Sequence, residues 1–200
     1  MPELRIQQYF MDSADACGQW ADQLAEPVAA AAQAVLDCVA NGGKVLACGS
    51  GAAAALAPYA AAVLMGGLAR PRPALPALAL GADAATLAAL ARPGDELEAL
   101  AAQVRALGQP GDALLVFAHP GHVGDAGLIL AVQAAHEREM SVIVLTGNDD
   151  AAEGFASLLQ APDVHVAVSD AGVAQALGAY LLALHGLCDA LDAMMLGDEE

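Results

Sequence analysis

Four short segments of this 200-residue sequence carry groups that could bind a ligand or transfer a proton. Gly49-Ser50-Gly51 follows an apolar run and precedes a row of alanines, which is the layout of a loop that holds a phosphate at the start of a helix. His119-Pro120-Gly121-His122 places two imidazoles three residues apart, where they could contact an anion or coordinate a metal. Asp83 supplies a carboxylate after another apolar run. His185 is a titratable group in a long apolar segment, where it could transfer protons.

Each segment also has a plainer structural interpretation. An HxxH spacing across Pro-Gly needs further ligands to hold a metal, so His119 and His122 are more simply surface histidines. Asp83 fits a helix cap as well as a ligand contact. A lone histidine such as His185 in an apolar helix is more often a core residue. A joint metal or redox role for His119, His122 and Cys48 is the least favoured, and the sequence predicts neither a bound metal nor a cofactor.

Five apolar runs alternate with helical stretches and predict the fold that positions these segments. The expected strands are residues 44–49, 76–80, 113–119, 141–147 and 164–168. The expected helices are 52–68, 84–91, 97–107, 123–138, 151–160 and 171–196. Continuous apolar strands separated by helices indicate an α/β fold: a three-layer, doubly wound, five-stranded parallel sheet with flavodoxin-like layering. Ligands bind beyond the carboxyl ends of such strands, here in the loops 49–53, 81–86, 118–125 and 147–151.

Two further helices are expected before the first strand. Leu4 to Ala25 is amphipathic, and Pro27 opens a second helix that ends near Ala40, before Asn41-Gly42-Gly43. The positions of the first helix expected to be buried are Leu4, Ile6, Tyr9, Phe10, Ala14, Cys17 and Leu24. We find no linker, and predict a single domain over residues 1–200, with an N-terminal helical arm (1–42) and an α/β core (43–200).

Composition excludes several classes of protein. A net charge of −17, from 24 acidic and 7 basic residues, argues against nucleic-acid binding and permits a basic protein partner. The four cysteines are far apart, which is typical of reduced thiols in a cytoplasmic protein. No signal peptide is apparent. Residues 45–69 are uncharged and long enough to span a membrane, but Gly-Ser-Gly and Pro58 interrupt them, so a buried strand, turn and helix is expected instead.

Several segments together resemble the sugar isomerase (SIS) domain family, in its branch of phosphoheptose isomerases and DnaA initiator-associating proteins. The segments that carry the resemblance are GKVLACGSGAAAALAPYAA (43–61), RPALPALALGADAATLAALA (72–91), QVRALGQPGDALLVF (103–117), AAHEREMSVIVLTG (134–147) and LHGLCDALDAMMLG (184–197). The resemblance covers the whole chain. It implies a homotetramer with sites between subunits that accept a sugar phosphate, a carbohydrate derivative.

The resemblance extends poorly to the residues that do chemistry in the isomerases. Their phosphate-binding serine, and the histidine and glutamate that serve a metal and proton transfer, correspond to Ala53, Tyr59 and Val63. A glutamine of the last helix corresponds to Leu177, while its histidine persists as His185. A second phosphate loop, rich in hydroxyl groups in the relatives, corresponds to residues 118–123, which contain no serine or threonine.

These replacements predict a non-catalytic protein that keeps a vestigial sugar-phosphate cleft. By its resemblance to the initiator-associating proteins, it would be an oligomeric regulator or scaffold for a protein such as a replication initiator. Met194-Met195-Leu196 would either contact that partner or lie in the tetramer interface. The alternative is a phosphoheptose isomerase-like enzyme, or a sensor of phosphosugars of the sedoheptulose 7-phosphate class. Zinc is expected only if the protein is an isomerase.

Overall fold

A sheet of five parallel strands forms the centre of the molecule. The computed structural model describes residues 1–90, 96–121, 125–147, 154–169 and 171–197. The strands are β1 (Val45–Gly49), β2 (Ala77–Ala79), β3 (Ala113–Phe117), β4 (Ser141–Thr146) and β5 (Val164–Ala167). Their order in the sheet is β2-β1-β3-β4-β5, with Val45 in register with Ala77 and with Ala113. The predicted doubly wound α/β fold with five parallel strands is confirmed.

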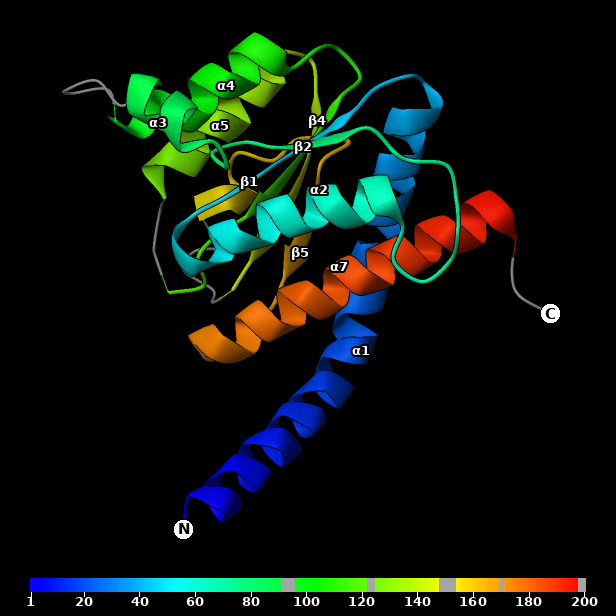
Figure 1. Ribbon diagram of the computed structural model, residues 1–200, viewed down its shortest axis with the longest axis vertical. Coiled ribbons are helices and arrows are strands. Elements are labelled where there is room, and N and C mark those ends of the chain that lie inside the picture. The colour runs from blue at the N-terminus through cyan, green and yellow to red at the C-terminus, as the bar shows by residue number, and fades with distance from the viewer. Residues whose placement is uncertain (91–95, 122–124, 148–153, 170, 198–200) are drawn as a thin grey trace.

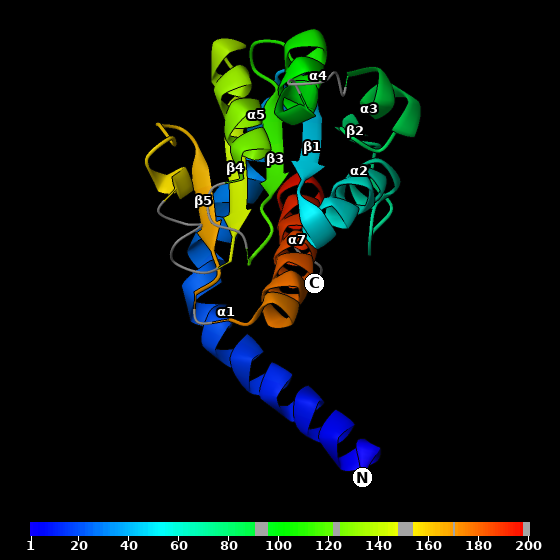
Figure 2. The same cartoon turned by 90° about the vertical axis from the view of Figure 1, so that its left-hand side faces the viewer.

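Helices cover both faces of the sheet and give the molecule its three layers (Figures 1 and 2). They are α1 (Pro2–Ala40), the 3-10 helix η1 (Gly51–Ala55), α2 (Leu56–Gly66), α3 (Ala84–Leu90), the 3-10 helix η2 (Glu96–Glu98), α4 (Ala99–Leu107), α5 (Ala126–Glu137) and α7 (Val173–Leu196). Val45 and Ala47 pack in the core beneath α1, α2 and α7. Leu46 and Cys48, which point to the opposite face, pack against α4 and α5. The central strands β1 and β3 are buried on both faces, and for this reason they are continuously apolar.

The N-terminal region is one continuous helix, so the prediction of two N-terminal helices is wrong. Pro27 lies inside α1, where its ring removes one backbone hydrogen bond. The helix continues through it because Trp20 and Leu24 before the proline, and Ala31 and Val35 after it, are all buried in the same core cluster. Figure 2 shows α1 changing direction between the half that packs on the domain and the half that projects from it.

The first half of α1 extends away from the rest of the chain, which reverses most of the expected burial. Leu4, Ile6, Tyr9 and Phe10 are 62%, 58%, 53% and 71% exposed, whereas Leu24 is buried as expected. Ala14 is also exposed, and Cys17 is half-buried. No other segment that the structure describes covers these side chains, so the amphipathic pattern did not predict their exposure.

The segment suspected of spanning a membrane is β1, η1 and α2, as expected. Pro58 is the third residue of α2, in the first turn, where a helix needs no N–H donor. By length and hydropathy alone, α7 is also apolar enough to cross a membrane. It is instead a core helix, because Tyr180, Leu184 and Leu191 on it are buried against the sheet and neighbouring helices.

Candidate functional site

The loops that follow β1 and β3 are fastened to each other at the carboxyl edge of the sheet. The Ser50 N–H donates to the Phe117 carbonyl at 3.1 Å. The Ser50 hydroxyl accepts a hydrogen bond from the His119 N–H, also at 3.1 Å. Ser50 therefore links two of the loops that the sequence singled out, and its hydroxyl keeps a hydrogen that can be donated to an oxyanion.

Gly51 and His119 are in close contact within this pair of loops. Gly51 has a positive φ of +50°, and a Cβ atom added to it would lie 2.5 Å from the Cδ2 atom of His119. The Gly121 N–H donates to His119 Nδ1 at 3.1 Å, which fixes the orientation of the ring. Thus Gly49, Ser50, Gly51, His119 and Gly121 form one local unit, which we call the anion loops. His122 lies outside the described residues.

Gly49 has no space for a side chain, which gives a test of how tightly the anion loops pack. A Cβ atom at Gly49 would lie 2.9 Å from the Phe117 carbonyl oxygen and 3.0 Å from the Ala54 Cα atom. Since both are backbone atoms, we expect Gly49→Ala to lower the free energy of unfolding by about 1–3 kcal/mol. Gly178 in α7 has nothing within 4 Å, so Gly178→Ala is the matched control, expected to stabilise by about 0.5–1 kcal/mol. Urea unfolding measures both; equal effects of the two variants would contradict the tight packing.

Tyr59 and His185 form a hydrogen-bonded pair between α2 and α7. The Tyr59 hydroxyl lies 2.8 Å from His185 Nε2, and the two ring centroids are 5.8 Å apart. Both side chains are half-buried. Figures 1 and 2 show α2 and α7 side by side, with α2 beginning directly after the loop that follows β1. The sequence pattern predicted a candidate site residue at His185, whereas Tyr59 was described only as the replacement of a histidine.

Tyr180 connects α7 to the anion loops. Its hydroxyl donates to the Ala118 carbonyl at 3.0 Å, and the side chain is fully buried. Burial raises the pKa of the Tyr180 hydroxyl, so it remains protonated and a donor. The helix that carries His185 therefore also holds the backbone next to His119.

Asp83 acts as a cap for α3 in this structure. Its carboxylate accepts hydrogen bonds from the Ala85 N–H at 3.2 Å, the Thr86 N–H at 3.0 Å and the Thr86 hydroxyl. The Thr86 hydroxyl, followed by the two backbone donors, lowers the pKa of Asp83. Nearby, the buried Gln103 accepts from the Gly81 N–H at 3.1 Å and so fixes the turn after β2.

The donor set around His185 contains few metal ligands. Ala53 and Val63 are buried, and Leu177 packs against the core. Among the residues that the structure describes, no group of three or more His, Cys, Asp or Glu side chains could hold a metal ion.

Three of the four cysteines should resist labelling in the folded protein. Burial raises the pKa of Cys38 and Cys188 to about 11 and that of Cys48 to about 12, and only Cys17 is not buried. Since the thiolate is the reactive species, we expect Ellman's reagent at about pH 8 to modify at most Cys17 in native protein. All four thiols should react after unfolding in guanidinium chloride. Rapid native labelling of Cys48 would contradict its burial and revive a redox role.

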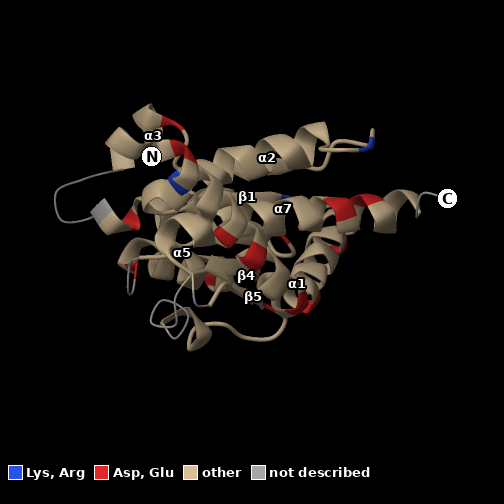
Figure 3. Cartoon of the chain, turned by 90° about the horizontal axis from the view of Figure 1, so that it is seen from below, with Lys and Arg blue, Asp and Glu red and all other residues tan. Residues whose placement is uncertain are grey.

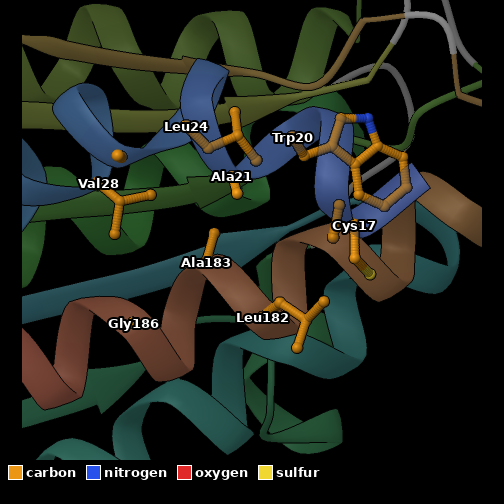
Figure 4. A pocket seen from close by; sticks show the side chains of 10 residues that line it. Cys17, Trp20, Ala21, Leu24, Val28, Leu182, Ala183 and Gly186 are labelled. Atoms are coloured by element: carbon orange, nitrogen blue, oxygen red, sulfur yellow. The ribbon is translucent and has the colours of Figure 1, made fainter. Parts of the chain in front are cut away.

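An apolar groove of about 250 Å³ lies between α1 and α7, next to the projecting half of α1. Trp20, Leu24 and Val28 line it from α1, and Leu182 and Ala183 from α7 (Figure 4). None of the described residues that line the groove is charged.

Acidic residues are spread over many elements, and basic residues are few in the view from below (Figure 3). This distribution, together with the net charge of −17, offers no basic stripe for a nucleic acid on the described part of the chain.

Comparison with known proteins places this geometry in a family. The SIS domain family matches residues 8–147. The chain belongs to the SIS domain family. It is 44% identical over 200 residues to a phosphoheptose isomerase of Methylibium petroleiphilum, covering all of this chain and 98% of that protein. It is 41% identical over 196 residues to a phosphoheptose isomerase of Azoarcus sp. (strain BH72), covering 98% of each. The phosphoheptose isomerase GmhA from Neisseria gonorrhoeae superposes with a TM-score of 0.86 at 36% identity, covering 96% of this chain and 100% of that one.

These relatives overturn the expectation of a non-catalytic protein that resembles the initiator-associating proteins. Full-length relatives at 41–44% identity carry the name phosphoheptose isomerase, which favours an enzyme. The expectation rested on replaced side chains taken one position at a time, with Tyr59 counted among the losses. In the folded chain, the Tyr59 hydroxyl lies 2.8 Å from His185 Nε2, a contact that such a comparison does not include.

Proposed function

We propose that this protein is a phosphosugar isomerase that interconverts the aldose and ketose forms of a heptose phosphate of the sedoheptulose 7-phosphate class. The observation that carries the proposal is the hydrogen bond between Tyr59 and His185, on helices that adjoin the anion loops. The names of the SIS-family relatives support the same reaction and substrate class.

The two parts of the site suit the two parts of such a substrate. The Ser50 hydroxyl and the His119 ring offer polar groups for the phosphate, and the hydrogen bonds between the loops hold those groups in place. His185, in the middle of α7, offers the group that moves a proton between adjacent carbons of the sugar.

The decisive experiment incubates the purified chain with sedoheptulose 7-phosphate and follows the aldose product by NMR. Unphosphorylated sedoheptulose is the control, because a site anchored by phosphate should turn it over far more slowly. Calorimetry with the phosphosugar separates the outcomes. Turnover supports the proposal; binding without turnover overturns the enzyme and leaves a sensor of the same ligand class; absence of binding overturns both.

We further propose that the active form is a homotetramer, in which the projecting half of α1 packs against other subunits. Support comes from Leu4, Ile6, Tyr9 and Phe10, which expose apolar surface on this half of α1, and from the groove beside it.

The cytoplasmic location expected from the sequence stays a prediction.

The tetramer can be tested by charging the projecting helix. Native mass measurement should give about four times the chain mass of 20.0 kDa. Phe10→Glu should lower this mass, since a buried charge at an apolar interface is costly. Gln7→Glu, at another exposed position of α1, should leave it unchanged. A wild-type mass of one chain would refute the assembly.

A further inference from the structure

The SIS-family resemblance implies zinc, but the residues of this chain do not fit a zinc site. A catalytic zinc ion takes three protein ligands from Cys, His, Asp or Glu. The positions implied to serve the metal hold Tyr59 and Val63 on α2, and only His185 on α7 is an ordinary zinc ligand. Its Nε2 atom is already hydrogen-bonded to the Tyr59 hydroxyl at 2.8 Å.

We infer that Tyr59 is a second catalytic residue, which works with His185 as an acid–base pair that needs no metal. This inference rests on the proposed isomerase function. It departs from the metal-dependent site that the resemblance implies. It follows from the contact between α2 and α7, where Tyr59 meets His185.

The proton transfers of an aldose–ketose isomerisation balance with these two groups alone. With substrate bound, the Tyr59 hydroxyl turns from His185 Nε2 to the carbonyl oxygen, which leaves Nε2 free as the base. His185 Nε2 then takes the proton from the hydroxyl-bearing carbon next to the carbonyl, and the electrons of that C–H bond form the enediol double bond. The Tyr59 hydroxyl gives its proton to the carbonyl oxygen. In the second half, protonated His185 returns a proton to the former carbonyl carbon, and the tyrosinate takes a proton from the other enediol oxygen. Both residues end as they began.

The surroundings of the pair suit this role. Val63, one helical turn after Tyr59, is 7% exposed, and Leu177 packs against the same core cluster. Apolar neighbours exclude water, and a hydrogen bond to a developing oxyanion is stronger where water is excluded. The replacements that remove metal ligands thus place apolar side chains on the two helices that carry the half-buried hydroxyl and imidazole.

The first test compares turnover of sedoheptulose 7-phosphate in metal-free buffer, with EDTA and with added zinc. We expect kcat to be the same within about twofold in all three, since the transfer of protons by side chains is independent of metal. Mass spectrometry of the metal content is a readout separate from activity, and should find far less than one zinc ion per chain. Inactivation by EDTA with recovery in zinc, or a full complement of zinc, would overturn the inference while leaving the isomerase function standing.

The second test removes the Tyr59 hydroxyl. Tyr59→Phe should lower kcat by about 10²–10³-fold with KM little changed, because the donor acts on the charge that develops during reaction. Ser157→Ala, which removes an exposed hydroxyl that donates to the Gly154 carbonyl at 3.1 Å, is the control. Full activity of Tyr59→Phe would overturn the role of Tyr59. If the wild-type chain shows no turnover under any condition, the proposed function itself fails, and this inference with it.

Discussion

Arg72→Met should lower the free energy of unfolding by about 3–5 kcal/mol, which is the effect of breaking a buried ion pair by removing one partner. The Arg72 side chain is 0% exposed and that of Asp192 is 1% exposed, and Arg72 Nε donates to Asp192 Oδ1 at 2.6 Å. The second carboxylate oxygen, Oδ2, is buried and has no hydrogen-bond partner among the residues that the structure describes. Without Arg72, a buried carboxylate would have no compensating charge.

Arg72 also fastens α2 to α7. Its guanidinium donates to the Leu64 carbonyl at 2.7 Å and to the Val63 carbonyl at 3.1 Å, near the end of α2. Asp192, near the end of α7, is held by the same side chain. The ion pair therefore supports the contact between the two helices that carry Tyr59 and His185. A loss of this size should lower the Tm by roughly 6–20 °C in a chain of this length.

Urea unfolding and calorimetry measure the effect, and the chain offers a matched control. Arg105 pairs with Glu98 and Glu137 on the surface, with 41% of its side chain exposed. Arg105→Met should therefore change stability by at most about 1 kcal/mol. The double variant Arg72→Met/Asp192→Leu should recover most of the loss, because no uncompensated charge remains. A loss below about 1 kcal/mol in Arg72→Met would show that the carboxylate finds another partner or protonates without difficulty.

The sheet was predictable because its physical requirements appear in consecutive residues. A strand that is buried on both faces must be apolar, and residues 45–48, 113–118 and 142–145 within the expected strands meet that condition. Even the short edge strand at 76–80 was found, although only Ala77–Ala79 pair in the structure. The end of α1 was found as well, since Gly42 takes a positive φ of +82° that favours glycine.

The N-terminal helix was harder to predict, because its features depend on distant surfaces. Whether a helix continues through Pro27 depends on how firmly its flanks are packed, and Trp20 and Ala31 are held by elements far along the chain. Burial of Phe10 cannot be inferred from periodicity alone either. The pattern shows which side of a helix is apolar, but not whether a neighbour covers it.

The candidate site shows the same limit at the level of single side chains. Tyr59 and His185 are 126 positions apart, so no local spacing connects them. Taken as a single position, Tyr59 stands only for the loss of the histidine that the isomerases have there. A signal was present in the replacement itself, since tyrosine keeps a titratable hydroxyl on a long side chain, whereas alanine at position 53 keeps nothing.

His185→Ala should lower kcat by about 10²–10⁴-fold, which is the usual contribution of a general acid–base residue. KM should change little, because the phosphate would still bind to the anion loops at Ser50 and His119. Measurement of kcat and KM for the phosphosugar separates these effects. The fold should persist, since His185 is only half-buried and the surrounding α7 residues Leu184 and Leu187 supply the packing.

His185→Gln separates proton transfer from structure at the same position. The glutamine amide can still hydrogen-bond the Tyr59 hydroxyl, so the contact between α2 and α7 should be kept, but an amide does not accept a proton near neutral pH. We therefore expect His185→Gln to match wild type in Tm and in phosphosugar binding while matching His185→Ala in kcat. His165→Gln is the control. His165 lies on β5, is half-buried and is hydrogen-bonded to the Thr146 hydroxyl of β4 at 2.8 Å, and its replacement should leave kcat unchanged. If His185→Gln retains most of the activity, His185 serves only to hold Tyr59, and the proton must be taken from the substrate by another group.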